Sequence, residues 1–204
     1  MTEIRPVKRI GFIGLGDMGL PMACNLIKAG FEVFGFDLRT DRLDLLKKDG
    51  GTIANSISEL GKSSDVVFVM VMTGKQVSEI ILGDKGLINS MQQGKTIILS
   101  STISPLDARE VGEPLSKAGI KIIDTPVSGG KSGAENGSLT MMAAASKETF
   151  DEHQDVLKGV GERIFHVGEE IGMGQTVKAA LQALIGSTFT AIFESLVLGA
   201  KAGV

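Results

Sequence analysis

The chain has 204 residues, of which 43% are hydrophobic and 22% charged, and its formal net charge is −3. This composition predicts a protein with a substantial core, in one large domain or slightly more. It contains no Trp or Tyr and no basic stretch, which argues against nucleic acid as a partner. A single cysteine, Cys24, excludes a disulfide within the chain, and the first residues lack the apolar core of a signal peptide. We therefore expect a cytoplasmic protein without a membrane partner.

Apolar, β-branched runs alternate with segments of helical periodicity along the first 174 residues. The runs predict strands, and the segments between them predict helices. Strands are predicted at residues 9–13, 32–36, 52–53, 65–72, 96–100, 121–124, 139–145 and 163–167. Helices are predicted at residues 18–29, 42–48, 57–62, 75–82, within 105–119, and at 149–159. This alternation indicates right-handed βαβ crossovers and a doubly wound, mostly parallel sheet of the Rossmann type.

The last thirty residues differ from the rest. Residues 175–204 carry no strand signal and predict one long helix with a kink near Gly186. We therefore divide the chain into a dinucleotide-binding domain, residues 1–174, and the start of an all-helical second domain, residues 175–204. We expect the chain to end inside or just after a long interdomain helix. The high apolar content of this helix predicts a homodimer or a higher homo-oligomer.

A glycine cluster follows the first strand. Gly14, Gly16 and Gly19 form G-x-G-x-x-G between a predicted strand and a predicted helix, the setting of a dinucleotide-binding fingerprint. The first glycine permits the turn, the second lets a pyrophosphate approach the backbone, and the third lets helix and strand pack closely. The alternative is a turn in a doubly wound fold that binds no nucleotide.

A carboxylate at the end of the second strand favours the nucleotide. Asp37 lies 23 residues after Gly14, where it can accept hydrogen bonds from the ribose hydroxyls of the adenosine. Its charge should repel a 2′-phosphate, so NAD is favoured over NADP, although Arg39 and Arg42 weaken that preference. We expect further cofactor contacts from neighbouring residues, namely Leu15, Asp17, Met18, Leu38, Arg39, Val71, Met72 and Thr102.

Four segments, in order, resemble the 3-hydroxyisobutyrate dehydrogenase (β-hydroxyacid dehydrogenase) family, and together they cover nearly the whole chain. They are FIGLGDMGLPMACN (residues 12–25), SSTISP (100–105), DTPVSGGKSGAENGSLTMM (124–142) and GMGQTVK (172–178). The resemblance implies an NAD(P)-dependent oxidoreductase whose second, helical domain completes the active site. It also implies that the segment with Thr102 lies beside the nicotinamide and substrate.

The same resemblance assigns roles to two other motifs. Ser128, Gly129 and Gly130 would bind the substrate carboxylate, and backbone N–H groups next to glycines suit such an anion. Lys178 would be the general acid/base that exchanges a proton with the reacting hydroxyl. Partial desolvation would lower the pKa of such a lysine, whereas the alternative is a lysine that extends to the surface.

One position departs from the family pattern. The family usually carries asparagine one turn after the lysine, whereas this chain has Gln182 at i+4 from Lys178. The longer amide shifts a substrate hydrogen bond, as in threonate-type members. The candidate substrates are therefore 3-hydroxyisobutyrate, a C4 sugar acid, tartronate semialdehyde and succinic semialdehyde.

Two other functions stay open. An imine-reductase-like enzyme or a catalytically incomplete NAD(P)-binding module would share the fold, but such relatives tend to lose the lysine. The remaining residues of interest are expected to be structural: Cys24 as a buried hydrophobe, His153 as a solvated residue of a polar helix, and His166 at a strand end. No Cys/His/Asp cluster has the spacing of a metal site.

Overall fold

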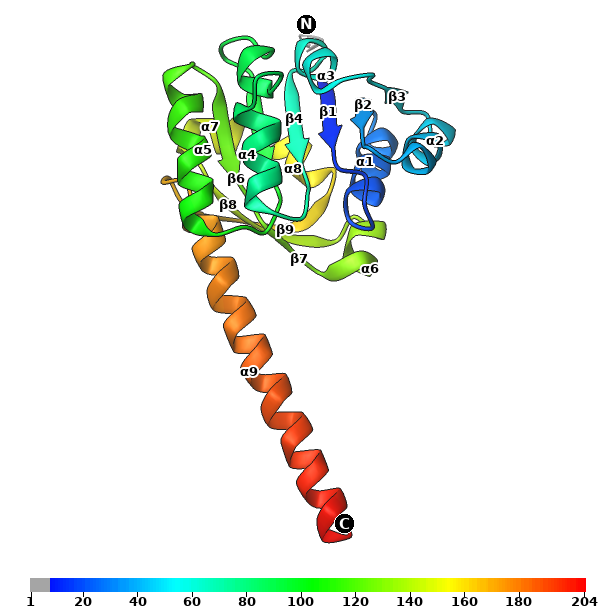
Figure 1. Cartoon of the computed structure of the whole chain (residues 1–204), viewed down its shortest axis with the longest axis vertical. Helices are drawn as coiled ribbons and strands as arrows, with labels where there is room; N and C mark the ends of the chain where they lie inside the picture. The colour runs from blue at the N-terminus through cyan, green and yellow to red at the C-terminus, as the bar shows by residue number, and fades with distance from the viewer. Residues whose placement is uncertain (1–7) are drawn as a thin grey trace, which may run out of the picture.

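The structure, a computed structural model, describes residues 8–204. These residues form a central sheet with helices on both faces and one long helix that projects from the domain (Figure 1). Side chains of β4 alternate between two cores: Val66 and Phe68 lie in one, and Val67 and Val69 in the other. A strand covered on both faces needs apolar residues at every position, which explains the continuous apolar runs.

The strands within residues 8–204 are β1 (Arg9–Ile13), β2 (Glu32–Phe36), β3 (Thr52–Ile53), β4 (Val66–Val69), β5 (Thr96–Leu99), β6 (Lys121–Asp124), β7 (Val127–Ser128), β8 (Leu139–Ala144) and β9 (Gly161–Gly168). Their order across the sheet is β3-β2-β1-β4-β5-β6-β8-β7, with β9 also paired to β8. The pairs from β3 to β6 are all parallel, whereas β8 runs antiparallel to β6 and β7. The predicted mostly parallel, Rossmann-type α/β fold is therefore confirmed.

The helices are α1 (Gly19–Lys28), α2 (Thr40–Lys48), α3 (Ile57–Ser63), α4 (Gly74–Leu82), α5 (Pro105–Lys117), α6 (Gly130–Glu135), α7 (Lys147–Glu152), α8 (Gln154–Lys158) and α9 (Met173–Ala202), with a 3-10 turn η1 at Leu87–Asn89. Side chains fix several of the starts. Ser56 caps α3, and Thr73 with Gln76 forms a capping box at α4.

The expectations for residues 125–159 need correction. Neither β7 nor α6 was predicted, and the helix expected at 149–159 is two helices, α7 and α8, that meet at His153. The segment Asp124–Ser128 continues along a single antiparallel register on β8, since Asp124 pairs with Ala144, Val127 with Met141 and Ser128 with Thr140. Short elements of two to six residues are held by such tertiary pairing and have too few residues to show a period.

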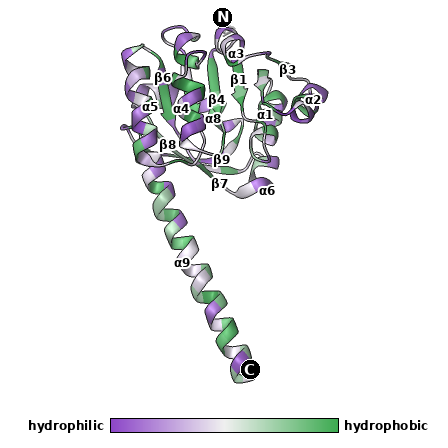
Figure 2. Cartoon of the chain, viewed as in Figure 1, coloured by the Kyte–Doolittle hydropathy of each residue, from purple (hydrophilic) through white to green (hydrophobic). Residues whose placement is uncertain are grey.

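The long helix α9 is continuous from Met173 to Ala202, so the kink predicted near Gly186 is wrong. Residues 173–202 contain no proline, and an added Cβ at Gly186 would meet no atom within 4 Å, so neither a missing backbone N–H nor a packing contact bends the helix there. Beyond its first turns, α9 extends away from the sheet, and its surface is largely apolar (Figures 1 and 2). By length and hydropathy it could cross a membrane, a weak indication because core helices of soluble proteins meet the same test.

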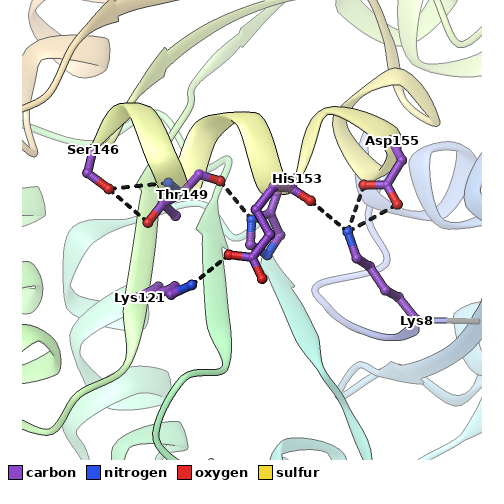
Figure 3. Close-up of polar contacts among 7 residues, drawn as sticks. Lys8, Lys121, Ser146, Thr149, His153 and Asp155 are labelled. Atoms are coloured by element: carbon purple, nitrogen blue, oxygen red, sulfur yellow. Dashed lines mark hydrogen bonds and ion pairs between the residues drawn. The ribbon is translucent and has the colours of Figure 1, made fainter. Parts of the chain in front are cut away.

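His153 is buried and not solvated as expected. Only 3% of its surface is exposed, and its Nδ1 lies 2.8 Å from the carbonyl oxygen of Thr149 (Figure 3). Burial lowers the pKa of His153 below 6.5, while its charged neighbours, Lys8, Lys121 and Glu152, form hydrogen bonds of their own. The folded state therefore favours the neutral imidazole.

This burial predicts that the protein loses stability in mild acid. A histidine whose pKa is lowered by folding stabilises the protein above its unfolded pKa of about 6.5, and this contribution is lost as pH falls further. We expect the free energy of unfolding to fall between pH 7 and 5, and His153→Asn to flatten this slope. Urea unfolding at several pH values measures it, with His166→Asn as the control. An unchanged slope in His153→Asn would contradict the prediction.

Candidate functional site

Two glycines of the cluster are required by the fold itself. Gly14 has φ of +91°, and a Cβ there would lie 2.2 Å from the Met70 carbonyl oxygen. A Cβ on Gly19 would lie 1.8 Å from the Gly14 carbonyl oxygen. The β1–α1 turn therefore packs against the end of β4, and α1 packs against the turn, at distances that only glycine allows.

The second glycine is different, because nothing in the fold crowds it. An added Cβ on Gly16 would find its nearest atom, Arg39 Nη2, at 3.9 Å. The open space lies at the start of α1, where no side chain caps the helix. Free N–H groups at a helix start attract a phosphate, and a Cβ would occupy the space through which it approaches. This region therefore fits a pyrophosphate.

Asp37 supports the same turn. Its carboxylate accepts hydrogen bonds from the backbone N–H of Leu15 at 2.7 Å and of Arg39 at 2.9 Å. Arg39 also forms an ion pair with Asp37, and Arg42 forms one with Asp17. Both arginines that could receive a 2′-phosphate thus already face carboxylates, an arrangement that suits NAD better than NADP.

The other expected cofactor residues divide into exposed and buried groups. Leu38 is 90% exposed and Met72 is 84% exposed, directly after the ends of β2 and β4. The Leu15 side chain, in contrast, is fully buried, and Met18 packs against the same core. Both exposed side chains lie at the edge where ligands of parallel sheets bind.

Thr102 lies in the exposed segment after β5. Thr102 does not cap the following helix, because Ser104 caps α5 by accepting a hydrogen bond from the N–H of Asp107 at 3.0 Å. The neighbouring Ser101 is fully buried, and its Oγ accepts a hydrogen bond from the Val71 N–H at 2.8 Å. The ends of β4 and β5 are therefore tied together beneath Thr102.

Ser128, Gly129 and Gly130 lie where β7 meets α6. Gly129 and Gly130 have φ of +131° and +60°, so this turn needs glycine for its shape as well as for any anion. Both glycines are exposed. Among the described residues, no hydrogen bond joins this turn to Thr102 or Lys178.

Lys178 lies one turn inside α9 and is only 7% exposed. Burial lowers the pKa of its ammonium group below the usual 10.5. No hydrogen bond or ion pair of its Nζ occurs among residues 8–204, so the charge is not compensated there. Gln182, one turn further along the helix, is exposed. A lysine with a lowered pKa is a common feature of catalytic sites.

Two buried polar residues at the start of α9, Asp124 and Gln175, were missed at the sequence level. Asp124, at the end of β6, accepts hydrogen bonds from the Gly172 N–H at 2.9 Å and from Nε2 of Gln175 at 2.7 Å. Burial raises the pKa of Asp124, although these hydrogen bonds act in the opposite direction. The sequence feature that could have revealed Asp124 is an acidic residue at the end of an apolar strand.

The start of α9 lies very close to the sheet. A Cβ on Gly174 would lie 2.5 Å from the Met142 carbonyl oxygen and 2.7 Å from that of Asp124. The glycine turn, Thr102 and the start of α9 therefore all occupy the carboxyl edge of the parallel strands, from which α9 departs (Figure 1). This is the edge at which open α/β sheets bind ligands.

The fold and the glycine turn define a dinucleotide-binding domain of the Rossmann type. Residues 9–168 match the family described as the NAD binding domain of 6-phosphogluconate dehydrogenase. The crystal structure of 3-hydroxyisobutyrate dehydrogenase from Salmonella typhimurium superimposes with a TM-score of 0.88 at 32% identity, over 97% of this chain and 69% of that one. The chain belongs to the 3-hydroxyisobutyrate dehydrogenase family and carries its NAD-binding domain.

Curated relatives give the same result at the level of sequence. A probable mitochondrial 3-hydroxyisobutyrate dehydrogenase of Dictyostelium discoideum is 38% identical over 97% of this chain and 61% of its own length. An L-threonate dehydrogenase of Cupriavidus necator is 36% identical over 97% of this chain and 66% of its own length. The chain thus spans less than two thirds of the curated relatives it matches, and the matched region includes α9.

The contrast between the glycines predicts separable effects on binding and folding. We expect Gly16→Ala to weaken NADH binding at least tenfold, about 1.4 kcal/mol, because the added methyl fills the approach to the phosphate. Its free energy of unfolding should change by less than about 0.5 kcal/mol. Gly19→Ala should lower both the NADH affinity and the free energy of unfolding, because its methyl group collides with the Gly14 carbonyl oxygen. Fluorescence titration and urea unfolding measure the two quantities, and wild-type NADH affinity in Gly16→Ala would contradict the assignment.

Proposed function

We propose that the protein is an NAD-dependent oxidoreductase acting on a small β-hydroxy acid, or on the matching semialdehyde in the reverse direction. The observation that carries the proposal is Lys178, a lysine that is 7% exposed and has no ion-pair partner among the described residues, at the carboxyl edge where the cofactor domain meets α9. A lysine in this position costs stability, and a chemical role for the amine accounts for its presence.

Residues of this chain would bind the cofactor and substrate and transfer the proton. NAD, when bound, supplies the acceptor for the hydride that leaves the carbinol carbon. The neutral amine of Lys178 takes the hydroxyl proton at Nζ, and its lowered pKa increases the neutral fraction near pH 7. Ser128 and the N–H groups of Gly129 and Gly130 bind the carboxylate. Gln182 and Thr102 orient the hydroxyl end of the substrate.

The cofactor is NAD in preference to NADP. Asp37 would accept hydrogen bonds from the ribose hydroxyls, and the nearby cations, Arg39 and Arg42, are paired with carboxylates. A 2′-phosphate would have to displace one of these pairs and then lie near Asp37, which repels it.

The substrate class follows from the relatives and from Gln182. Relatives similar to this chain are named for 3-hydroxyisobutyrate and L-threonate, both small hydroxy acids. A glutamine amide reaches further than the asparagine usual in the family, which favours a C4 sugar acid beside 3-hydroxyisobutyrate. The second candidate function is an NAD(P)-binding module without turnover.

The protein assembles through α9. A stripe of apolar side chains, including Phe189, Ile192, Phe193 and Leu196, follows one face of this helix, and all four are exposed. Covering such a stripe with a second copy removes it from water. We also propose residues 1–174 as the cofactor domain, residues 175–204 as the start of the helical one, and a cytoplasmic location.

Removing the amine tests the enzymatic proposal. We expect the purified protein to reduce NAD with 3-hydroxyisobutyrate or L-threonate, or to oxidise NADH with tartronate semialdehyde or succinic semialdehyde. Lys178→Ala should lower kcat by roughly 10²–10⁴-fold without weakening NADH binding. Lys201→Ala, which removes an exposed lysine from the same helix, is the matched control. NADH binding without turnover of any of these substrates would favour the non-catalytic module.

The apolar stripe makes a separate prediction about assembly. Light scattering should give the mass of a dimer or a larger oligomer. Phe193→Glu should shift the mass towards the monomer, because a carboxylate in a covered apolar interface is costly to desolvate. Thr188→Glu adds the same charge beside the stripe and is the control. A wild-type protein that is monomeric at all concentrations would rule out assembly through α9.

A further inference from the structure

The side chain of Gln175 contacts the backbone on both sides of Thr102. Its Oε1 accepts a hydrogen bond from the Ile103 N–H at 3.1 Å, and its Nε2 donates one to the Ser101 carbonyl oxygen at 3.0 Å. Thr102 itself stays exposed between these two anchors. A single amide on α9 therefore fixes the loop that carries Thr102.

The second proton of the same amide binds Asp124. Nε2 lies 2.7 Å from Asp124 Oδ1, while Asp124 Oδ2 accepts from the backbone N–H of Gly172 at 2.9 Å. Nε2 thus faces two acceptors and Oε1 faces one donor, so only one orientation of the amide satisfies every group. Gln175 is 1% exposed and Asp124 is fully buried, and in such surroundings a satisfied network is rigid.

This network reaches both groups assigned to the reaction. Lys178 lies three residues after Gln175, on the same side of α9. Ser101, bound by the amide through its carbonyl, also holds the Val71 N–H through its hydroxyl at 2.8 Å. The ends of β4, β5 and β6 and the first turn of α9 are therefore joined around one side chain.

We propose that Gln175 is a positioning residue that fixes the distance between Thr102 and Lys178 by binding the loop around Thr102 and Asp124 with one amide. The proposal rests on the proposed function. Asp124 alone caps the start of α9, so the two contacts to Ser101 and Ile103 are not needed to hold the helix. Their effect is to set the loop after β5 relative to the helix that carries the amine.

The test compares variants of Gln175 in the whole protein. Gln175→Leu keeps the size of the side chain and removes all three hydrogen bonds. Gln175→Glu keeps its shape but sets a carboxylate against Asp124 and the Ser101 carbonyl. Gln92→Leu makes the same change at an exposed site and is the matched control. Because displacements near 1 Å can lower rates about 100-fold, we expect kcat of Gln175→Leu to fall by this factor.

The effects on kcat, KM and NADH binding distinguish a positioning role from a general loss of structure. We expect KM and the NADH dissociation constant to change less than about threefold in Gln175→Leu, because the glycine turn and the carboxylate-binding turn are untouched. The pKa of Lys178, measured by NMR of 13C-methylated lysines, should shift in Gln175→Leu, because the surroundings of the lysine change, and stay unchanged in Gln92→Leu. A kcat within threefold of wild type together with an unchanged Lys178 pKa would overturn the proposal.

Two further measurements keep the result decisive. If Gln175→Leu fails to fold, Gln175→Asn retains the amide but is too short to reach both Asp124 and the loop, and the same criteria apply to it. If the wild-type protein turns over no hydroxy acid, the proposed function fails, but the Lys178 pKa and hydrogen exchange of the Ile103 N–H still test the network. Faster exchange at Ile103 with a shifted Lys178 pKa supports it, and no change in either contradicts it.

Discussion

The junction between sheet and long helix depends on one buried carboxylate. Asp124 is fully buried and has no ion-pair partner among residues 8–204, so N–H donors of the first turn of α9 and the Gln175 amide must compensate its charge. Separating such a group from its donors costs several kcal/mol (order of magnitude). The first turn of α9 is therefore held at the end of β6, and this contact sets the position of Lys178.

Close backbone approach is the second constraint, and it acts near the beginning and near the end of the chain. Near the N-terminal end, Gly14 and Gly19 let β1, α1 and the end of β4 meet at distances no side chain permits. Near the C-terminal end, Gly174 does the same for α9 and the strands beneath it. Between these two points lie the loops after β4 and β5, and the glycines thus fix the backbone on either side of these loops.

The sequence predicted the features that repeat or carry a motif, and it missed those that depend on distant partners. Continuous apolar runs identified the parallel strands, because both faces are covered, and the glycine spacing identified the cofactor turn. The roles of Asp124 and Gln175 were not visible, since their contacts lie 48 to 74 residues apart along the chain. His153 was misassigned because its neighbours Glu152 and Gln154 are polar, although it faces the core. The assignments of Ser128, Gln182 and Lys178 remain predictions.

Because α9 is long, the contacts that hold its first turns also determine where its far end lies. Thirty residues at 1.5 Å each make a rod of about 45 Å, anchored only through its first turns. A rotation of about 5° at the anchor would displace the far end by about 4 Å over that length. The orientation of whatever packs on the outer half of α9, relative to the carboxyl edge of the sheet, is thus set at Gly172–Lys178. A methyl group added at Gly174 would tilt the start of α9, and the resulting displacement would be largest at the far end of the helix.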